Sequence, residues 1–210
     1  MGLFIVFEGV DGSGKTQQSR LLSDHLKRKR RKVLLTKEPG GDDSISCMIR
    51  LILLNPDHKN KIATKAELML FEADRAQHVD RIIMPALRND EIVISDRFDA
   101  ATYAYQVYAR NVCSAEEFFR LNEFATNALS PDFIFWFDLD PTIGLKRNAN
   151  AGKKDRFELE GIEFHRNVRK GYTEYFQNIP EEKYAKIPAN RPIEKIHEEI
   201  LQILDKKFKI

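Results

Sequence analysis

The stretch Gly9-Val10-Asp11-Gly12-Ser13-Gly14-Lys15-Thr16 decides the fold, because it matches the P-loop pattern G-x-x-x-x-G-K-[ST] at every fixed position. A short apolar run, residues 3–7, precedes it, and a helix is expected to begin at Lys15. The glycines let the backbone curl so that successive N–H groups point at phosphate oxygens, and the helix N-terminus adds its positive pole. Residues 9–16 are therefore predicted to bind the phosphates of a nucleoside triphosphate, rather than to form a glycine turn without a ligand.

Two side chains of this loop and one from a later strand carry the expected phosphate and metal chemistry. Lys15 is predicted to reach the β- and γ-phosphates, and Thr16 offers a hydroxyl to Mg²⁺. Asp96 follows the apolar run 92–95, so it stands at the carboxyl end of a strand and can hold a Mg²⁺-bound water beside Thr16. Lys15 and Asp96 are therefore predicted to be catalytic, and Thr16 and Asp96 to be the metal ligands. The P-loop alone does not separate ATPases, GTPases and small-molecule kinases.

Apolar runs alternate with longer amphipathic stretches along the chain. The apolar runs suit strands buried on both faces of a parallel sheet and lie at residues 3–7, 33–36, 92–95, 133–138 and, more weakly, 184–187. Helices are expected over residues 15–28, 44–54, 65–88, 114–129, 141–151, 158–176 and 193–208. This alternation predicts an α/β fold, a doubly wound five-stranded parallel sheet with helices on both faces, in one domain spanning residues 1–210.

Composition and charge exclude several classes of protein. The chain is 42% apolar and 31% charged, with a net charge of +2, which is typical of a soluble globular enzyme and gives no reason to expect nucleic acid as a partner. The basic run 27–32 is interpreted as the solvated end of the first helix rather than as a nucleic-acid patch. The N-terminal apolar run is too short for a membrane span or signal segment, and Cys47 and Cys113 have no metal-binding spacing. We therefore expect a cytoplasmic protein with reduced thiols.

A kinase that acts on a phosphorylated acceptor needs further cations, because it must hold two anionic groups in line and neutralise charge during transfer. Arg97 directly follows Asp96, and its planar donor fork is predicted to be catalytic by binding the acceptor's phosphate; a structural ion pair is the alternative. A second set of cations lies in a predicted lid at residues 146–158, for which a solvated loop is the alternative. These cations are Arg147, Lys153, Lys154 and Arg156.

An aromatic ring and a guanidinium group share one face of the helix expected over residues 65–88. Phe71 and Arg75 are spaced i, i+4, so they can stack a base and bond its edge, although a phenylalanine at helical spacing is more often part of the core. Polar aromatic residues and a glutamine follow Asp96 and could line the same pocket. They are Tyr103, Tyr105, Gln106 and Tyr108.

Short segments spread over most of the chain form a more specific pattern than the P-loop alone. They are 7–17 (FEGVDGSGKTQ), 36–41 (TKEPGG), 65–71 (KAELMLF) with Arg75, 96–98 (DRF), 104–106 (AYQ), 121–125 (LNEFA) and 131–132 (PD). In this order they resemble the bacterial-type thymidylate (dTMP) kinases, a P-loop nucleoside monophosphate kinase family. The resemblance implies Mg²⁺-dependent transfer of the γ-phosphoryl group of ATP to dTMP, giving dTDP and ADP without a covalent intermediate. It also implies a homodimer.

The resemblance also implies a role for each acceptor-site residue. Phe71 would stack on thymine, Arg75 would bond its O4 edge, and Thr102 and Gln106 would read the base. Tyr105 would lie against the deoxyribose, Asp11 near the sugar and the magnesium, and Arg97 on the phosphate. The remaining substrate contacts implied by the resemblance are Glu38 and Arg50.

The sequence departs from the family pattern at several of these places. Lys37 stands where an arginine is usual, which replaces a bidentate fork by a point charge. The stretch from 41 to 50 is one residue longer than usual, which leaves the role of Arg50 open. Gly12 replaces an arginine that some relatives carry in the P-loop, and alanines occupy positions 149 and 151 in the lid. A remaining lid cation must then act, and Arg156 is the predicted one.

Two other functions remain open from the sequence. One is a P-loop kinase that acts on a different nucleoside monophosphate or on a deoxynucleoside. The other is a nucleotide-dependent switch, or an inactive binding protein, that uses ATP to change shape. We expect small-molecule nucleotides as partners, with no nucleic acid and no membrane.

Overall fold

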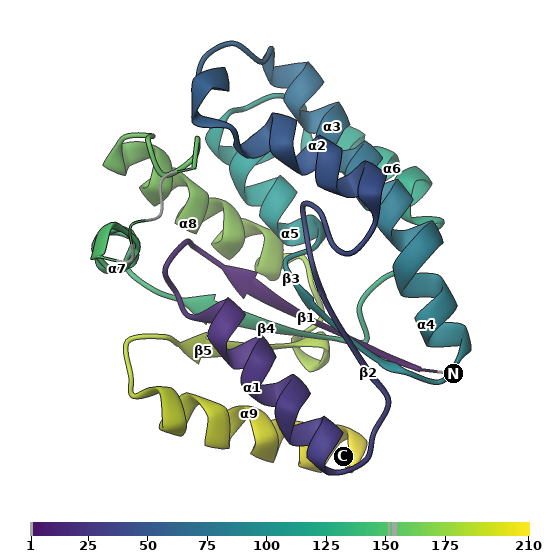
Figure 1. Ribbon diagram of the computed structural model, residues 1–210. Coiled ribbons are helices and arrows are strands. Elements are labelled where there is room, and N and C mark those ends of the chain that lie inside the picture. The colour runs from purple at the N-terminus through teal and green to yellow at the C-terminus, as the bar shows by residue number, and fades with distance from the viewer. Residues whose placement is uncertain (1, 151, 153–154) are drawn as a thin grey trace.

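The computed structural model describes residues 2–150, 152 and 155–210, and its centre is a five-stranded parallel sheet with strand order β2-β3-β1-β4-β5 (Figure 1). The strands are β1 (Leu3–Gly9), β2 (Val33–Lys37), β3 (Ile92–Asp96), β4 (Phe133–Asp138) and β5 (Tyr184–Pro188). Each of the five predicted runs forms one of these strands, to within two residues at either end. The register pairs Phe7 with Asp96 and with Phe135, so β1 lies at the centre with a strand on each side.

Helices cover both faces of the sheet, as the sequence predicted. Helices α1 and α9 lie on one face, and α4, α5 and α8 on the other (Figure 1). The longer helices are α1 (Lys15–Arg28), α2 (Ser44–Leu54), α3 (Thr64–His78), α6 (Ala115–Thr126), α7 (Pro141–Asn150), α8 (Ile162–Gln177) and α9 (Ile193–Phe208). Shorter ones are α4 (Met84–Arg88), α5 (Asp99–Thr102) and the 3₁₀ turns η1 (Pro56–His58) and η4 (Glu181–Lys183).

The core lies between the sheet and these two helix layers, which explains why the strands read as continuous apolar runs. The Phe7 ring is fully buried and packs against the rings of Phe135 and Phe137, with centroids 5.3 and 5.6 Å apart. Burying one such side chain contributes about 1.5–3 kcal/mol. The central strand is therefore firmly held, and it fixes the position of the loop that follows it.

The sequence prediction missed one helix. Directly after β3, α5 continues into the π-helical segment η3 (Tyr103–Ala109), which packs along α8. Every residue from 98 to 107 is buried. A helix that is enclosed all round shows no amphipathic pattern, so the periodicity that reveals the other helices is absent here.

The predicted helix 65–88 is continuous but changes its winding. A π-helical segment, η2 (Val79–Ile83), lies between α3 and α4. The prediction that α8 begins near residue 158 was wrong, because it begins at Ile162. Instead, Asp155 Oδ1 accepts hydrogen bonds from the backbone N–H groups of Phe157 and Glu158, at 2.9 and 3.0 Å, and forms a turn.

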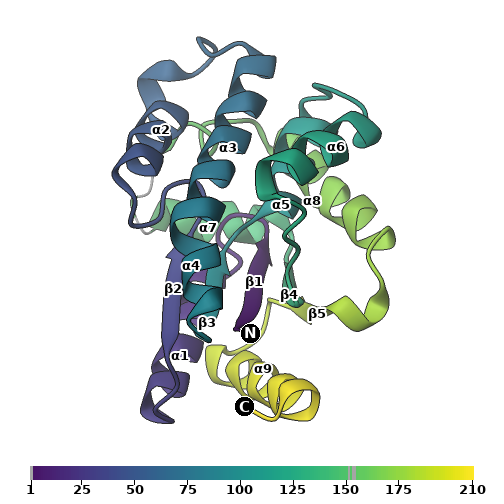
Figure 2. The same ribbon diagram turned by 90° about the vertical axis from the view of Figure 1, so that its right-hand side faces the viewer.

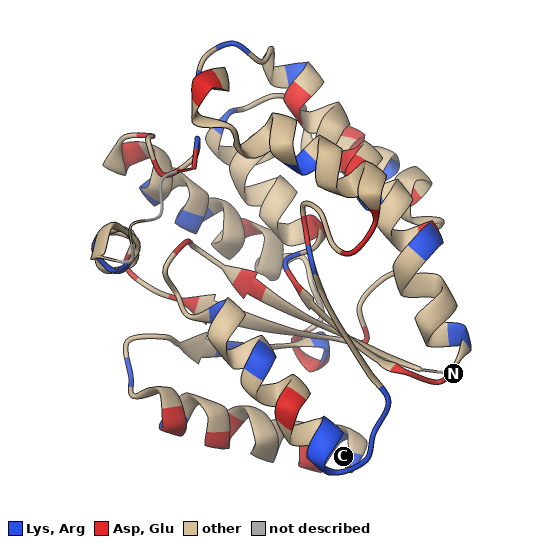
Figure 3. Cartoon of the chain, in the orientation of Figure 1, with Lys and Arg blue, Asp and Glu red and all other residues tan. Residues whose placement is uncertain are grey.

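The basic run 27–32 lies at the end of α1 and in the loop before β2, at the opposite end of α1 from the P-loop (Figure 3). All six of its side chains are exposed. This placement agrees with a solvated helix end. Within the described ranges, none of the helices combines the length and the hydropathy that crossing a membrane requires.

Candidate active site

A cleft of about 1130 Å³ opens along the carboxyl ends of β1, β2 and β3 and is continued by the turn 155–158 and the segment 189–194. Most of the predicted site residues line it. They are Asp11, Gly12, Ser13, Gly14, Lys15, Thr16, Glu38, Arg50, Phe71, Arg75, Asp96, Arg97, Thr102, Tyr105 and Gln106. Gly9 and Val10 lie behind the cleft as the start of the loop, and Arg156 is not among the lining residues.

Close backbone packing requires glycine at two positions of the P-loop. A Cβ on Gly9, whose φ is 140°, would lie 2.3 Å from the carbonyl oxygen of Phe137. A Cβ on Gly12, whose φ is 72°, would lie 2.2 Å from the carbonyl oxygen of Gly144 in α7. The glycine at position 12, which replaces the arginine of some relatives, thus lets α7 pack directly against the loop.

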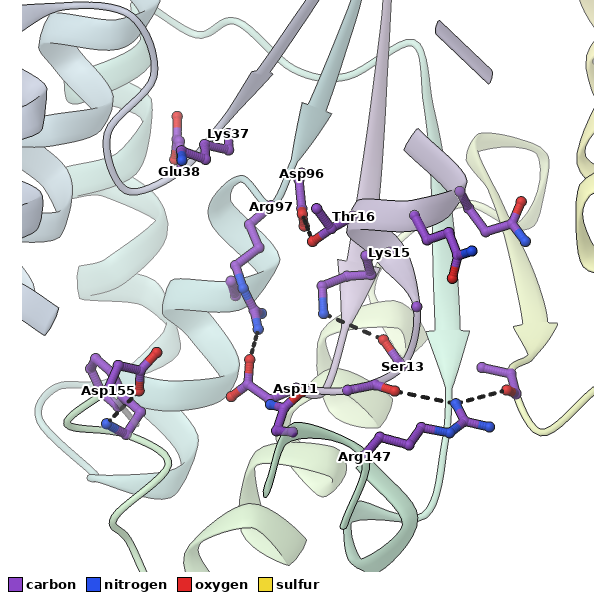
Figure 4. A pocket seen from close by; sticks show the side chains of 18 of the residues that line it. Asp11, Ser13, Lys15, Thr16, Lys37, Glu38, Asp96, Arg97, Arg147 and Asp155 are labelled. Carbon is purple, nitrogen blue, oxygen red and sulfur yellow. Dashed lines mark hydrogen bonds and ion pairs between the residues drawn. The ribbon is translucent and has the colours of Figure 1, made fainter. Parts of the chain in front are cut away.

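Lys15 lies inside the curled loop. Its Nζ donates to the carbonyl oxygens of Gly9 and Val10, both at 2.8 Å. It also donates to Ser13 Oγ at 3.3 Å (Figure 4). Burial lowers the pKa of Lys15, and the nearby positive charge of Arg97 lowers it further. A polyphosphate in the loop would replace these neutral acceptors by anionic ones, which a desolvated ammonium group favours.

Thr16 and Asp96 come together from the N-terminus of α1 and the end of β3. Thr16 Oγ1 donates a hydrogen bond to Asp96 Oδ2 (Figure 4). A hydroxyl and a carboxylate are oxygen ligands of the kind that Mg²⁺ takes, and Mg²⁺ usually completes its shell with water and phosphate oxygens. The donor set therefore fits the metal that the sequence predicts.

The backbone of Arg97 adopts a conformation that is uncommon for a residue with a side chain. Its φ is 78°, in the left-handed region, which costs of order 1–3 kcal/mol. Two hydrogen bonds hold it there, one from its N–H to the Phe7 carbonyl at 2.9 Å and one from Ser95 Oγ to its own carbonyl at 2.7 Å. The turn directs the guanidinium group back across the P-loop.

That guanidinium group joins the P-loop to η3 and α8. It donates to Asp11 Oδ1 at 2.5 Å and to the hydroxyl of Tyr172 at 2.8 Å, while the Tyr105 hydroxyl donates to Asp11 Oδ2 at 2.6 Å. Burial opposes ionisation of Asp11, but Arg97 and Lys15 outweigh it and lower the pKa of Asp11 to about 2. Asp11, Arg97 and Tyr105 thus form one charged cluster between the two ends of the cleft.

Glu8 is a buried residue that supports this cluster and that the sequence prediction did not assign. Its Oε1 accepts from the N–H groups of Phe98 at 2.7 Å and Ala101 at 3.3 Å, and its Oε2 accepts from the Tyr172 hydroxyl at 3.0 Å. Burial raises the pKa of Glu8 above its ordinary value. A carboxylate at the end of an otherwise apolar strand was the signal that could have found it.

Arg75 lies on α3 at the floor of the cleft and is 1% exposed. Its five N–H donors all meet protein acceptors within 3.2 Å, which are Glu38, Glu72, Asn122, the Phe98 carbonyl and Thr102. An acceptor base that bonds Arg75 must therefore share one of these bonds or replace its acceptor. Every N–H group of Arg75 is thus already paired, and none is free for the predicted direct contact to the base.

An additional aromatic residue stands beside Phe71. Phe157, in the turn 155–158 within the predicted lid, lines the cleft with its ring centroid 6.0 Å from that of Phe71 and 5.6 Å from that of Tyr105. The sequence prediction did not assign Phe157 a role, because nothing in the sequence shows which way a residue in an irregular segment points.

The predicted lid cation Arg156 is directed away from the cleft. The side chain is 2% exposed, its Nε donates to the Leu53 carbonyl at 2.8 Å, and its Nη1 pairs with Glu67. The structure therefore gives Arg156 a buried structural ion pair instead of a place at the phosphates. Lys153 and Lys154, the two alternatives to Arg156 as the acting lid cation, lie outside the described residues.

Arg147, on α7, is a lid cation that does line the cleft. Its Nη1 donates to the Gly12 carbonyl at 3.2 Å and to the Ala189 carbonyl at 3.5 Å (Figure 4). The side chain is exposed and lies over the P-loop, which Gly12 allows by its close contact with α7. Of the two arginines in the described part of the predicted lid, Arg147 is therefore the one that lies at the cleft.

The segment after β2 forms the other wall of the cleft. Glu38 is buried and bonds both Arg75, at 3.0 Å, and His78 Nδ1, at 2.9 Å. Arg50 donates to the Pro39 carbonyl, and both Arg50 and Lys37 line the cleft. The longer stretch between 41 and 50 therefore still brings Arg50 to the site.

Comparisons with known proteins agree with this geometry. The family model described as thymidylate kinase matches residues 7–200. Thymidylate kinases of Pelobacter propionicus and Onion yellows phytoplasma are 41% and 42% identical to the chain; each alignment spans 99% of the chain, and 96% and 99% of the relatives. The crystal structure of thymidylate kinase from Ehrlichia chaffeensis superposes with a TM-score of 0.78 at 30% identity, over 98% of this chain and all of that one. The chain therefore belongs to the thymidylate kinase family.

Proposed function

We propose that the chain transfers the γ-phosphoryl group of ATP to dTMP, giving ADP and dTDP, with Mg²⁺ as the metal. Membership of the family makes it a nucleoside monophosphate kinase, a phosphotransferase with ATP as the phosphoryl donor. The observation that carries the proposal is the shared cleft, which holds the P-loop at one end and the pocket of Phe71 and Gln106 at the other. The Asp11–Arg97 pair lies between them.

ATP would occupy the P-loop end. The backbone of residues 9–16 and Lys15 would hold the β- and γ-phosphates, and Thr16 with Asp96 would hold Mg²⁺ or its bound water. Bound there, Mg²⁺ would neutralise charge on the β- and γ-phosphates. Beyond the loop, Arg20 and the segment 189–194 line the cleft and are the walls left for the nucleoside of ATP.

dTMP would occupy the other end, with its base between the rings of Phe71 and Phe157 and its edge toward Thr102 and Gln106. Its phosphate would meet Arg97, whose guanidinium group would exchange its bond to Asp11 for a charged phosphate oxygen. Tyr105, held edge-on by Phe157 and bonded to Asp11, would limit the space beside the sugar.

The reaction then needs positioning and charge stabilisation rather than a covalent intermediate. A phosphate oxygen of dTMP attacks the γ-phosphorus in line with the departing ADP oxygen. Lys15 and Arg97 would stabilise the negative charge of the transferring group, and Arg147, which lies over the P-loop beside Gly12, would add positive charge near the phosphates of ATP. The pKa of Asp11, lowered to about 2, keeps this carboxylate ionised throughout the neutral range.

A coupled ADP-release assay tests the proposal. The purified protein, ATP and Mg²⁺ are combined in turn with dTMP, dUMP, dCMP, AMP, GMP and thymidine. We expect dTMP to give the highest kcat/KM. Preference for another acceptor would contradict the proposal, and nucleotide binding without acceptor-dependent ADP release would favour a switch or binding protein.

We also propose that the chain forms a homodimer through α2, α3 and α6, which lie side by side (Figure 2). Large apolar side chains are exposed on these helices, namely Ile45, Met48, Leu51, Ile52, Met69 and Phe124. A second copy of the chain would remove them from water. In sedimentation velocity we expect a dimer for the wild type, and a monomer for Leu51→Glu combined with Phe124→Glu. Leu159→Glu, exposed elsewhere, is the matched control.

We propose further that residues 1–210 act as one domain in the cytoplasm. A single cleft takes residues from Asp11 to Ile196, which supports one cooperative unit. Cys47 and Cys113 are free thiols, which suits a reducing compartment.

A further inference from the structure

The amide group of Gln106 has a defined orientation. Gln106 belongs to η3, lines the cleft and is 1% exposed. Its Nε2 donates to Glu67 Oε1 at 2.9 Å. The other amide atom, Oε1, is buried and accepts no hydrogen bond from any of the residues that the structure describes. Gln106 therefore brings an unused acceptor to the cleft.

Glu67 is the reason for this orientation. It lies in the first turn of α3, is 1% exposed, and also accepts from Arg110 Nε at 2.8 Å and from Arg156 Nη1. Both of its oxygens already accept from guanidinium groups, which can only donate, so the Glu67 carboxylate presents only acceptors to its neighbours. The amide of Gln106 can then face Glu67 only with its NH₂ group, so its oxygen faces away.

Thr102 is left as a hydrogen-bond donor, because its partner Arg75 is a donor, whereas the partner of Gln106 is an acceptor. Its Oγ1 accepts from Arg75 Nη2 at 2.7 Å, and a guanidinium group can only donate. The hydroxyl hydrogen of Thr102 is thus left to donate elsewhere. Thr102 and Gln106 are one helical turn apart in α5 and η3, and together they offer a base one donor and one acceptor.

We propose that Glu67 is a positioning residue that sets the base specificity of the kinase by fixing Gln106 as an acceptor; this inference rests on the proposed function. The edge of thymine or uracil presents the O4 acceptor and the N3–H donor, which complement Thr102 and Gln106. Cytosine presents an N4 amino donor and an N3 acceptor, so both contacts would be mismatched. A buried site that hydrogen-bonds its substrate rejects such an analogue by about 10⁴-fold.

The test compares kcat/KM for dTMP and dCMP in the wild type and in Glu67→Gln. A glutamine at position 67 carries a donor as well as an acceptor, so the Gln106 amide is free to turn. Its NH₂ group can then donate to N3 of cytosine. We expect the dTMP-to-dCMP ratio to fall about 10- to 100-fold, partly through a rise in kcat/KM for dCMP. The KM for ATP should stay within about twofold of the wild type.

Glu160→Gln is the matched control. Glu160 Oε1 accepts from the same Arg110, at 2.8 Å, but within the described part of the chain it makes no hydrogen bond with Gln106. This variant loosens the same cluster without touching the amide, so we expect it to keep the wild-type ratio. If Glu160→Gln lowers the ratio as much as Glu67→Gln does, general loosening explains the effect and the inference is overturned.

Gln106→Met keeps the inference testable if Glu67→Gln does not fold, because it leaves Glu67 with both arginines. We expect kcat/KM for dTMP to fall about 10- to 100-fold while that for dCMP is unchanged. A crystal structure of the wild type with dTMP should show Gln106 bridging Glu67 and thymine N3. An unchanged ratio in Gln106→Met, or a Gln106 amide that leaves Glu67 in the complex, would overturn the inference.

Failure of the inference and failure of the proposed function give different results. A wild type that phosphorylates dTMP, with variants that keep its ratio, refutes only the role of Glu67. A wild type that releases no ADP with dTMP refutes the proposed function itself.

Discussion

Replacing Arg156 by alanine separates the two roles that the sequence and the structure give this residue. The structure buries Arg156 beside Glu67, with a second bond to the Leu53 carbonyl and its guanidinium carbon 4.5 Å from the centroid of the Phe157 ring. Removing one partner of a buried ion pair costs about 3–5 kcal/mol. Arg110 remains beside Glu67, so the carboxylate keeps one cation. We therefore expect the lower end of this range, a loss of about 3 kcal/mol in the free energy of unfolding.

In a protein of this length, about 3 kcal/mol corresponds to a fall in Tm of about 6–12 °C. Thermal unfolding followed by circular dichroism measures this fall. Because Arg156 does not line the cleft, we expect kcat below the transition to fall less than about tenfold, well short of the 10²–10³ that losing a charge-stabilising group costs.

Arg147→Ala provides the opposite pattern in the same experiment. Arg147 is exposed, so its removal should change the free energy of unfolding by no more than about 0.5 kcal/mol, while kcat should fall about 10²-fold. The reasoning is refuted if Arg156→Ala keeps the wild-type Tm and loses kcat by 10²-fold or more. That result would show that Arg156 turns toward the phosphates during turnover.

Three further predictions concern other parts of the cleft. Lys15→Ala should abolish turnover in the ADP-release assay, by at least about 10²-fold, while circular dichroism shows a folded protein; full activity would refute its role. Phe71→Ala should raise the KM for dTMP about 10- to 100-fold without changing the KM for ATP, since stacking on a base contributes about 1–3 kcal/mol. The pKa of Asp74, which burial raises from 3.8 to about 7, makes the folded chain bind more protons than the unfolded chain between those pH values, so the free energy of unfolding falls as pH rises through that window. Asp74→Asn keeps an acceptor for the Gly40 N–H, and urea unfolding at pH 5 and 8 should show a smaller fall than in the wild type.

The sequence predicted those parts of the molecule that local physics determines. The P-loop, the five strands and helices such as α1 and α9 follow from glycine geometry and from apolar periodicity, and these signals lie within a few neighbouring residues. Asp96 could be placed beside Thr16 because the carboxyl ends of parallel strands meet at one edge of the sheet.

Features that depend on contacts between distant segments could not be predicted in this way. The residues of α5 and η3 are enclosed by the sheet and α8, so their pattern resembles no amphipathic helix. Arg156 carries the same charge as Arg147, and only the position of Glu67, 89 residues away, shows that it turns inward. Glu67 itself lies within a recognised motif, but its three partners come from two other parts of the chain, the end of η3 and the turn 155–158.

The π-helical segment η2 changes the direction in which side chains point along one continuous helix, so that α3 and α4 can each face a different part of the molecule. Before it, Arg75 faces the cleft; after it, Leu87 is buried against the sheet. A π turn holds about one residue more than an α turn, which corresponds to a rotation of about 100°. Deleting a single residue from 79–83 would therefore rotate α3 relative to α4. Either the floor of the base pocket or the packing of α4 against β3 would then lose its side chains.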